Sequence, residues 1–106
     1  MALAVPEVIE SHLADIAALA ERFGVETLAL FGSAATGEFD ASRSDIDLVV
    51  TFRQMGPAEH AEAYFGLLEA LQDVLAYQVD LLEEGAIRNR YLRRSIDLAK
   101  RTLYAA

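Results

Sequence analysis

Apolar residues recur along this chain at two spacings, one typical of helices and the other of strands. Steps of three and four over residues 6–24 predict one amphipathic helix, which begins at Pro6 and stops at Gly24. Similar spacing predicts further helices over residues 58–76 and 87–100. The predicted buried positions of the first two helices are Ile9, Leu13, Ile16, Ala20 and Phe23, and Ala61, Phe65, Leu68, Leu71 and Leu75.

Short continuous apolar runs between these helices predict buried strands. They cover residues 27–31, 45–52, 78–82 and 101–104. A helix joins the second strand to the third, so we expect those two to be parallel neighbours. The small, polar loop 34–44 is too short for most crossovers, so the first two strands should be antiparallel. The prediction is one domain over residues 1–106, of α/β (α+β) class, with helices packed on a small mixed sheet.

Composition narrows the class of protein further. The chain has 106 residues, 54% of them hydrophobic, no cysteine and a net charge of -8. The missing cysteines exclude disulfides and thiolate chemistry, and the negative charge disfavours direct nucleic-acid binding. It suits metal cations or a basic partner. No membrane-length apolar run or signal-peptide pattern is present, so we expect a cytoplasmic protein.

Three aspartates interrupt the otherwise apolar strands. Asp45 and Asp47 project to the same side of the second strand, about 7 Å apart at the backbone. If the third strand is a parallel neighbour, Asp80 reaches the same space; if it is an exposed edge, only two ligands remain. Clustered carboxylates repel one another unless a cation neutralises them, and they suit Mg²⁺. We therefore predict a magnesium site, with room for two ions about 3.5–4 Å apart.

A glycine-serine turn ends the first predicted strand. Gly32 allows the backbone to approach a phosphate, and Ser33 adds a hydroxyl, although a serine here also suits a helix cap. If the first two strands are antiparallel, this turn lies beside Asp45 and Asp47. Triphosphate and metal would then meet at one place.

Together these residues resemble the signature of the polymerase-beta-like nucleotidyltransferase superfamily. Phe31-Gly32-Ser33 is followed after eleven residues by Asp45-Ile46-Asp47, and later by Val79-Asp80-Leu81. The short chain is similar to the minimal nucleotidyltransferases, many of which are antitoxins paired with a HEPN-domain toxin.

The resemblance implies a palm-like nucleotidyltransferase fold and a set of site residues. Asp45, Asp47 and Asp80 would be the catalytic and metal-binding carboxylates for Mg²⁺, and Gly32 and Ser33 would contact the triphosphate. The implied reaction transfers AMP from ATP to a tyrosine hydroxyl of the toxin.

One position departs from the family pattern. Thr36 stands where the loop commonly has an arginine, and Arg43 is the candidate to replace that nucleotide contact. The departure keeps a second interpretation open, in which the chain neutralises its toxin by binding alone. Transfer to a small molecule or an RNA end is a third. The basic segment Arg88, Arg90, Arg93 and Arg94 is either a solvated helix face or a contact for phosphate or a partner.

Overall fold

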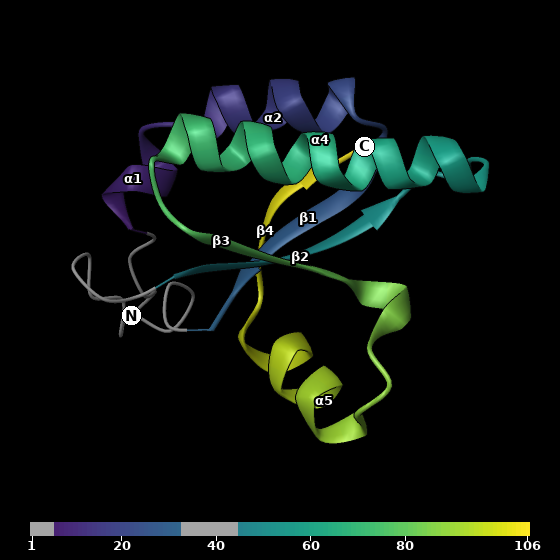
Figure 1. The fold of residues 1–106 in the computed structure, drawn as a ribbon. Coiled ribbons are helices and arrows are strands. Elements are labelled where there is room, and N and C mark those ends of the chain that lie inside the picture. Colours follow the sequence, from purple (N-terminus) through teal and green to yellow (C-terminus); the bar gives the residue numbers. More distant parts are fainter. Residues whose placement is uncertain (1–5, 33–44) are drawn as a thin grey trace.

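The computed structural model describes residues 6–32 and 45–106 of the chain. The described part folds into four strands, four α-helices and a short 3₁₀ helix (Figure 1). In chain order these are α1 (Glu7–Glu10), α2 (Leu13–Arg22), β1 (Val25–Phe31), β2 (Ile46–Phe52), α4 (Pro57–Leu75), β3 (Val79–Glu83), η1 (Glu84–Ala86), α5 (Arg90–Ala99) and β4 (Arg101–Ala105).

The strands form one mixed sheet in the order β3-β2-β1-β4. β1 is antiparallel to both β2 and β4, whereas β2 and β3 are parallel and joined through α4. The predicted strand directions and the mixed sheet are therefore confirmed. Helices α2 and α4 lie together over one face, and α5 lies on the opposite side (Figure 1).

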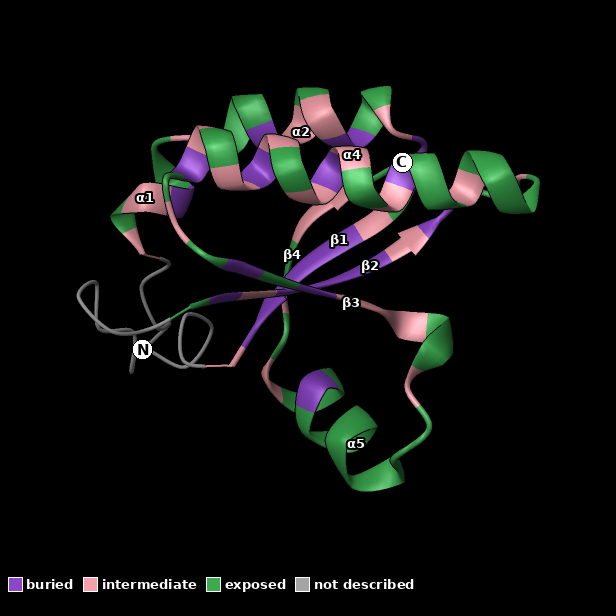
Figure 2. Cartoon of the chain, viewed as in Figure 1, coloured by how far each residue is buried: buried purple, intermediate pink, exposed green. Residues whose placement is uncertain are grey.

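Alternate side chains of β2 point to opposite faces of this sheet. Ile46, Leu48 and Val50 are buried in the main core, which α2 and α4 cover. Val49 points the other way, into a small cluster with Ile96 of α5. The period of two is the one that a pleated strand imposes, and Figure 2 shows buried positions concentrated in the sheet and on the inner sides of α2 and α4.

The first predicted helix is interrupted. The structure has two helices, α1 and α2, separated by a turn at Ser11 and His12. The Ser11 hydroxyl donates to the carbonyl of Val8 (3.4 Å), and His12 Nδ1 lies 2.8 Å from the same oxygen. Short polar side chains that bond nearby carbonyls compete with the helix ladder, which apolar spacing alone does not reveal.

The predicted buried stripe of α4 was partly wrong. Its buried residues are Ala63, Leu67, Leu71 and Leu75, whereas Phe65 is 65% exposed. A Cβ built on Gly66 would lie 2.5 Å from the ring of Phe23, so the glycine marks where the helix meets α2.

The last helix begins three residues later than predicted. Asn89 is its N-cap, since its side chain accepts hydrogen bonds from the backbone N–H groups of Tyr91 (2.9 Å) and Leu92 (3.1 Å). Tyr91, in the first turn of this helix, is 79% exposed.

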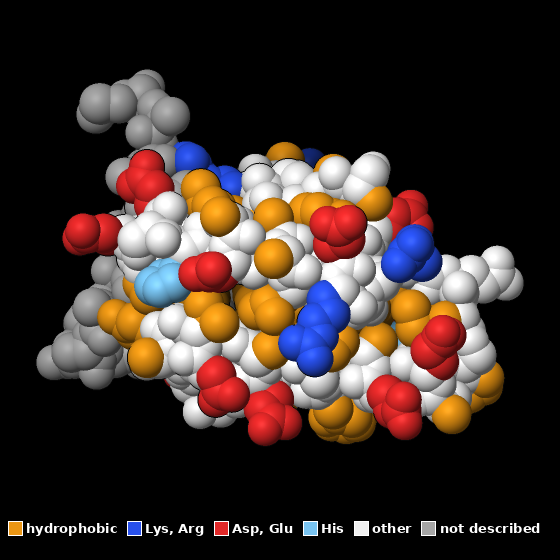
Figure 3. All heavy atoms as spheres, turned by 90° about the horizontal axis from the view of Figure 1, so that it is seen from above, with side chains coloured by type: hydrophobic (Ala, Val, Ile, Leu, Met, Phe, Trp, Pro, Cys, Tyr) orange, Lys and Arg blue, Asp and Glu red, His pale blue; other side chains and the backbone are white. Residues whose placement is uncertain are grey.

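Seen from above in Figure 3, the outer surface of the α2 and α4 layer carries carboxylates scattered among apolar and neutral side chains. Within the described residues, no helix is both long enough and apolar enough to cross a membrane.

Candidate active site

The parallel pairing of β2 and β3 brings two of the predicted carboxylates together. Strand β3 is both the parallel neighbour of β2 and an edge of the sheet, so the two alternatives do not exclude each other: Asp80 is exposed and still lies directly opposite Asp47 in the register of the two strands. Asp45 comes two residues before Asp47, immediately ahead of the strand, on the same side. Because Leu48 and Leu81 face the main core, the aspartates face the side of the sheet on which α5 lies.

Asp47 is the carboxylate most affected by this grouping. It is half-buried, whereas Asp45 and Asp80 are exposed. Its pKa is raised above the ordinary value by burial first, then by the charge of Asp80, and then by that of Asp45. Among the described residues, no lysine, arginine or histidine forms a salt bridge with any of the three. This repulsion is what a bound cation would relieve.

The fit to a metal can be judged from the donor set. Carboxylate oxygens are the ligands that Mg²⁺ prefers, and two of these three side chains are open to solvent. Over residues 6–32 and 45–106, no three His, Cys, Asp or Glu side chains stand close enough together to hold a metal ion in their present rotamers. Metal binding by Asp45, Asp47 and Asp80 therefore stays a prediction, and it requires their side chains to turn toward one another.

The turn after β1 lies against this carboxylate group. Gly32 adopts a positive φ of 68°, and a Cβ built on it would lie 2.4 Å from Oδ2 of Asp47. The backbone conformation therefore favours glycine here, and any other residue would also have to displace the Asp47 carboxylate. The predicted meeting of the Gly32 turn with Asp47 is confirmed, whereas Ser33, Thr36 and Arg43 lie outside the described residues.

Edge strand β3 is held to α4 near Asp80. The hydroxyl of Tyr64 donates to the backbone carbonyl of Leu81 at 2.6 Å. Its pKa is raised by burial and by the charges of Asp80 and Glu83. His60, to which the sequence assigned no role, bonds Glu83 and so forms a second tie between α4 and β3.

The contacts of Glu84, on the sheet face that carries the aspartates, could not be predicted from sequence spacing. Glu84 accepts a hydrogen bond from the hydroxyl of Thr51 in β2 (3.0 Å) and forms an ion pair with Arg93 of α5 (3.4 Å). Lys100 lies 3.7 Å from the same carboxylate. These contacts fix α5 on the sheet face that carries the aspartates, and no local motif marks Glu84.

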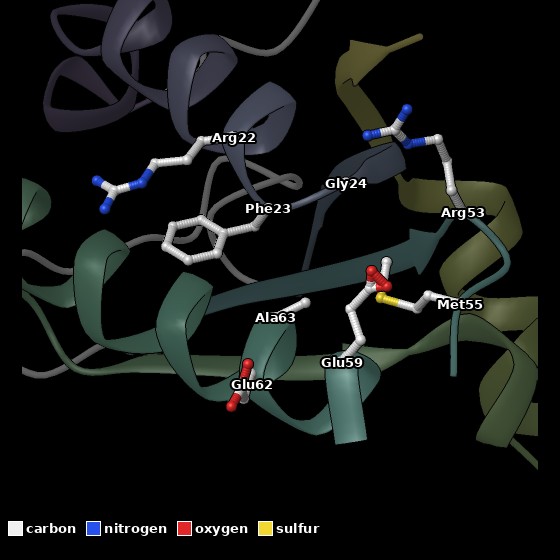
Figure 4. Close-up of a pocket in the computed structure, with 8 residues that line it drawn as sticks. All are labelled: Arg22, Phe23, Gly24, Arg53, Met55, Glu59, Glu62 and Ala63. Carbon is white, nitrogen blue, oxygen red and sulfur yellow. The ribbon is translucent and has the colours of Figure 1, made fainter. Parts of the chain in front are cut away.

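A hollow of about 290 Å³ lies elsewhere on the molecule. Phe23 and Gly24 from the end of α2 and the start of β1, Arg53 just after β2, and Glu59 near the start of α4 are among its lining residues (Figure 4). Since β1 and β2 are antiparallel, this is the opposite end of both strands from Gly32 and Asp47. The hollow is therefore separate from the aspartate group.

Comparison with known proteins identifies the family. The chain belongs to the nucleotidyltransferase domain family, whose model matches residues 16–104. This confirms the resemblance carried by the glycine-serine turn and the aspartates.

Two relatives are identical to this chain at about a third of the aligned residues. A candidate protein adenylyltransferase of Methanocaldococcus jannaschii is 38% identical over 79 residues, which cover 74% of this chain and 77% of the relative. The protein adenylyltransferase MntA of Thermococcus cleftensis is 34% identical over 90 residues, 84% of this chain and 87% of the relative.

Solved structures show the same fold. A minimal nucleotidyltransferase superposes with a TM-score of 0.68 at 26% identity, over 90% of this chain and 92% of the other. A toxin-antitoxin complex with AMP-PNP gives 0.68 at 22% identity (89% and 73%). A complex of a tri-AMPylated Shewanella oneidensis HEPN toxin with an MNT antitoxin gives 0.63 at 19% (92% and 72%).

Proposed function

We propose that this chain is a Mg²⁺-dependent nucleotidyltransferase that transfers AMP from ATP to a hydroxyl group of a partner protein. The observation that carries the proposal is the placement of Asp47 opposite Asp80, with the backbone of Gly32 against Asp47. Family membership supports the class of reaction. The relatives named as protein adenylyltransferases support a protein acceptor.

Each carboxylate has a proposed role. Asp45 and Asp47 would hold Mg²⁺, with Asp80 as the third carboxylate of the set. Bound Mg²⁺ supplies positive charge that neutralises the triphosphate and orients it for in-line displacement. The raised pKa of Asp47 supports this assignment, because such a carboxylate gains most when a cation arrives.

The nucleotide would lie over the turn after β1. Gly32 leaves room for a phosphate to approach the backbone, Ser33 would add a hydroxyl donor, and Arg43 is the candidate for a cationic contact. In the reaction the acceptor oxygen attacks the α-phosphorus, the bond to pyrophosphate breaks, and the acceptor hydroxyl loses its proton. Asp80, which is exposed beside Asp47, would receive that proton.

The acceptor we propose is a tyrosine of a HEPN-type toxin, which would make this chain the antitoxin of a toxin-antitoxin pair in the cytoplasm. The support is a shared fold with an MNT antitoxin whose HEPN partner is tri-AMPylated. The toxin-antitoxin complex with AMP-PNP, an ATP analogue, supports ATP as the donor.

The test is an adenylylation assay. We would incubate the purified chain with ATP, Mg²⁺ and the product of the adjacent gene, as the candidate HEPN-domain acceptor, and follow the mass of the acceptor. We expect wild type to add AMP, and Asp47→Asn to lower the rate by at least about 100-fold. Asp73→Asn makes the same chemical change on the exposed side of α4 and should leave the rate unaltered.

Equal rates for wild type and Asp47→Asn would remove the catalytic proposal. A variant that neutralises the toxin without modifying it would instead support an antitoxin that acts by binding alone.

Metal binding has a test that does not require turnover. Without nucleotide or partner, Mg²⁺ should raise the melting temperature of wild type, because a ligand that binds only the folded state stabilises it. The shift should be absent in Asp45→Asn/Asp47→Asn and present in Asp73→Asn. A shift of equal size in all three proteins would place the cation elsewhere.

A further inference from the structure

The positive charge of this acidic protein is concentrated in one short segment. Residues 88–101 contain six of the nine lysines and arginines but only one of the seventeen acidic residues, Asp97. The six cationic residues are Arg88, Arg90, Arg93, Arg94, Lys100 and Arg101. Since α5 occupies most of this segment, it differs in charge from the rest of the molecule.

Helix α5 also exposes large apolar side chains on one outward stripe. Tyr91 is 79% exposed and Leu98 is 78% exposed, whereas Ile96 is buried against the sheet. Arg94 lies between the two at steps of three and four, and Arg90 stands one turn before Arg94. We call these four residues, Arg90, Tyr91, Arg94 and Leu98, the α5 stripe. Single exposed apolar residues are ordinary, but here two are aligned with two arginines.

The cations on the two sides of α5 have different surroundings. Arg93 and Lys100 pair with Glu84, which also bonds Thr51, and so they hold the helix on the sheet. Arg90 and Arg94 form no salt bridge with any residue that the structure describes. Arg93 and Lys100 are therefore engaged within the chain, whereas Arg90 and Arg94 are exposed and available to a partner.

The position of α5 connects its stripe to the candidate active site. The helix packs through Ile96 on Val49, two residues along β2 from Asp47 and on the same sheet face. A protein docked on α5 would therefore extend beside the aspartate group. Tyrosine and arginine are also the side chains most enriched among residues that dominate binding energy at protein interfaces.

We propose that the α5 stripe is the docking surface for an acidic helical segment of the acceptor protein, which holds that protein beside the aspartates. This inference rests on the proposed function for the identity of the acceptor. Charge complementarity selects an acidic partner. The stripe runs over the nine residues 90–98, about 12 Å along a straight helix axis, which suits a second helix lying across it. Nucleic acid fits less well, because the remaining surface is strongly acidic.

The test measures binding separately from chemistry. The probe is the HEPN-domain protein used in the adenylylation assay, titrated without ATP or Mg²⁺ by calorimetry at two salt concentrations. We expect Arg90→Glu/Arg94→Glu to weaken binding at least about tenfold and to reduce its salt dependence. The control Arg22→Glu/Arg53→Glu changes the net charge equally on the other layer and should change the affinity less than about threefold.

A second pair of variants tests the apolar part of the stripe. Tyr91→Ser/Leu98→Ser should weaken binding at least about tenfold, whereas Leu13→Ser/Phe65→Ser removes two exposed apolar side chains elsewhere and should have little effect. All of these side chains are exposed, and circular dichroism would verify that each variant remains folded.

The outcomes separate this inference from the proposed function. Wild-type affinity in both α5 variants overturns the docking surface, even if AMP transfer is observed. Lost binding in those variants supports the surface even if no AMP is transferred. If the α5 variants instead lose binding to bulk tRNA, or lose self-association in sedimentation while still binding the HEPN protein, the assigned occupant is wrong.

Discussion

The two faces of the sheet differ in what they bury. Among the residues that the structure describes, sixteen are buried in one core beneath α2 and α4, whereas four, Ala29, Phe31, Val49 and Ile96, are buried on the face beneath α5. The second face carries Asp47 and Asp80 instead. Strand β2 contributes to both faces through its alternation, so neighbouring residues in the sequence point separately into the main core and toward the proposed active site. Each prediction below tests this division.

The largest effect on stability is expected from truncating a side chain in the larger core. Leu48→Ala removes a fully buried side chain and should lower the free energy of unfolding by about 2–5 kcal/mol. Val49→Ala, the neighbour on the other face, should cost only about 1.5 kcal/mol. Urea denaturation with unchanged slopes would measure both. Equal losses would mean that the two faces contribute alike to stability.

The next effect concerns the contact between the Gly32 turn and Asp47. Gly32→Ala should cost about 1–3 kcal/mol, because the residue has a positive φ and its new Cβ would collide with the carboxylate. It should also reduce AMP transfer by moving Asp47. Gly85→Ala is the control, since a Cβ there has nothing within 4 Å. Full stability and activity of Gly32→Ala would show that the turn does not constrain the carboxylate.

Sequence patterns were sufficient to predict the four strands and the relative directions of the first three, because apolar runs and connection lengths are local properties; the pairing of β4 with β1 was not predicted. The facing of Asp47 and Asp80 followed from those directions. Spacing could not predict the break at Ser11 and His12, which depends on side-chain bonds to a carbonyl. Nor could it predict which side of α4 is buried, because that side is set by contacts with distant residues, such as Gly66 against Phe23.

The remaining part of the site depends on contacts between distant residues. Glu84 is an ordinary acidic residue in the sequence, and only the fold brings it to Thr51 and Arg93. Ser33 and Arg43 remain predictions, because the described residues do not include them.

A smaller effect is expected at the start of α5. Asn89→Ala removes the cap that accepts bonds from two backbone N–H groups and should cost about 1 kcal/mol, while Asn89→Asp keeps an acceptor and should cost less. Because few residues are buried on this face, the loss should appear first as faster hydrogen exchange of α5 amides. Unchanged exchange in α5 would indicate that the helix is held by Glu84 without its cap.

The smallest effect concerns the charge of Asp47 in the absence of metal. Its pKa is raised in the folded protein by burial, then by the charge of Asp80, and then by that of Asp45. As the pH rises above 3.8, a larger fraction of Asp47 therefore remains protonated in the folded state than in the unfolded state. The free energy of unfolding therefore falls as the pH rises from 3.8 through the folded pKa of Asp47. Above that pKa the carboxylate is ionised in both states, and the destabilisation is complete. With EDTA present, Asp47→Asn should be more stable than wild type at pH 7, by less than about 1 kcal/mol for a half-exposed group. The gain should vanish toward pH 3.8, and Asp73→Asn controls for removing one negative charge. A loss of stability at pH 7 in Asp47→Asn would show that this face, like the other, is optimised for folding.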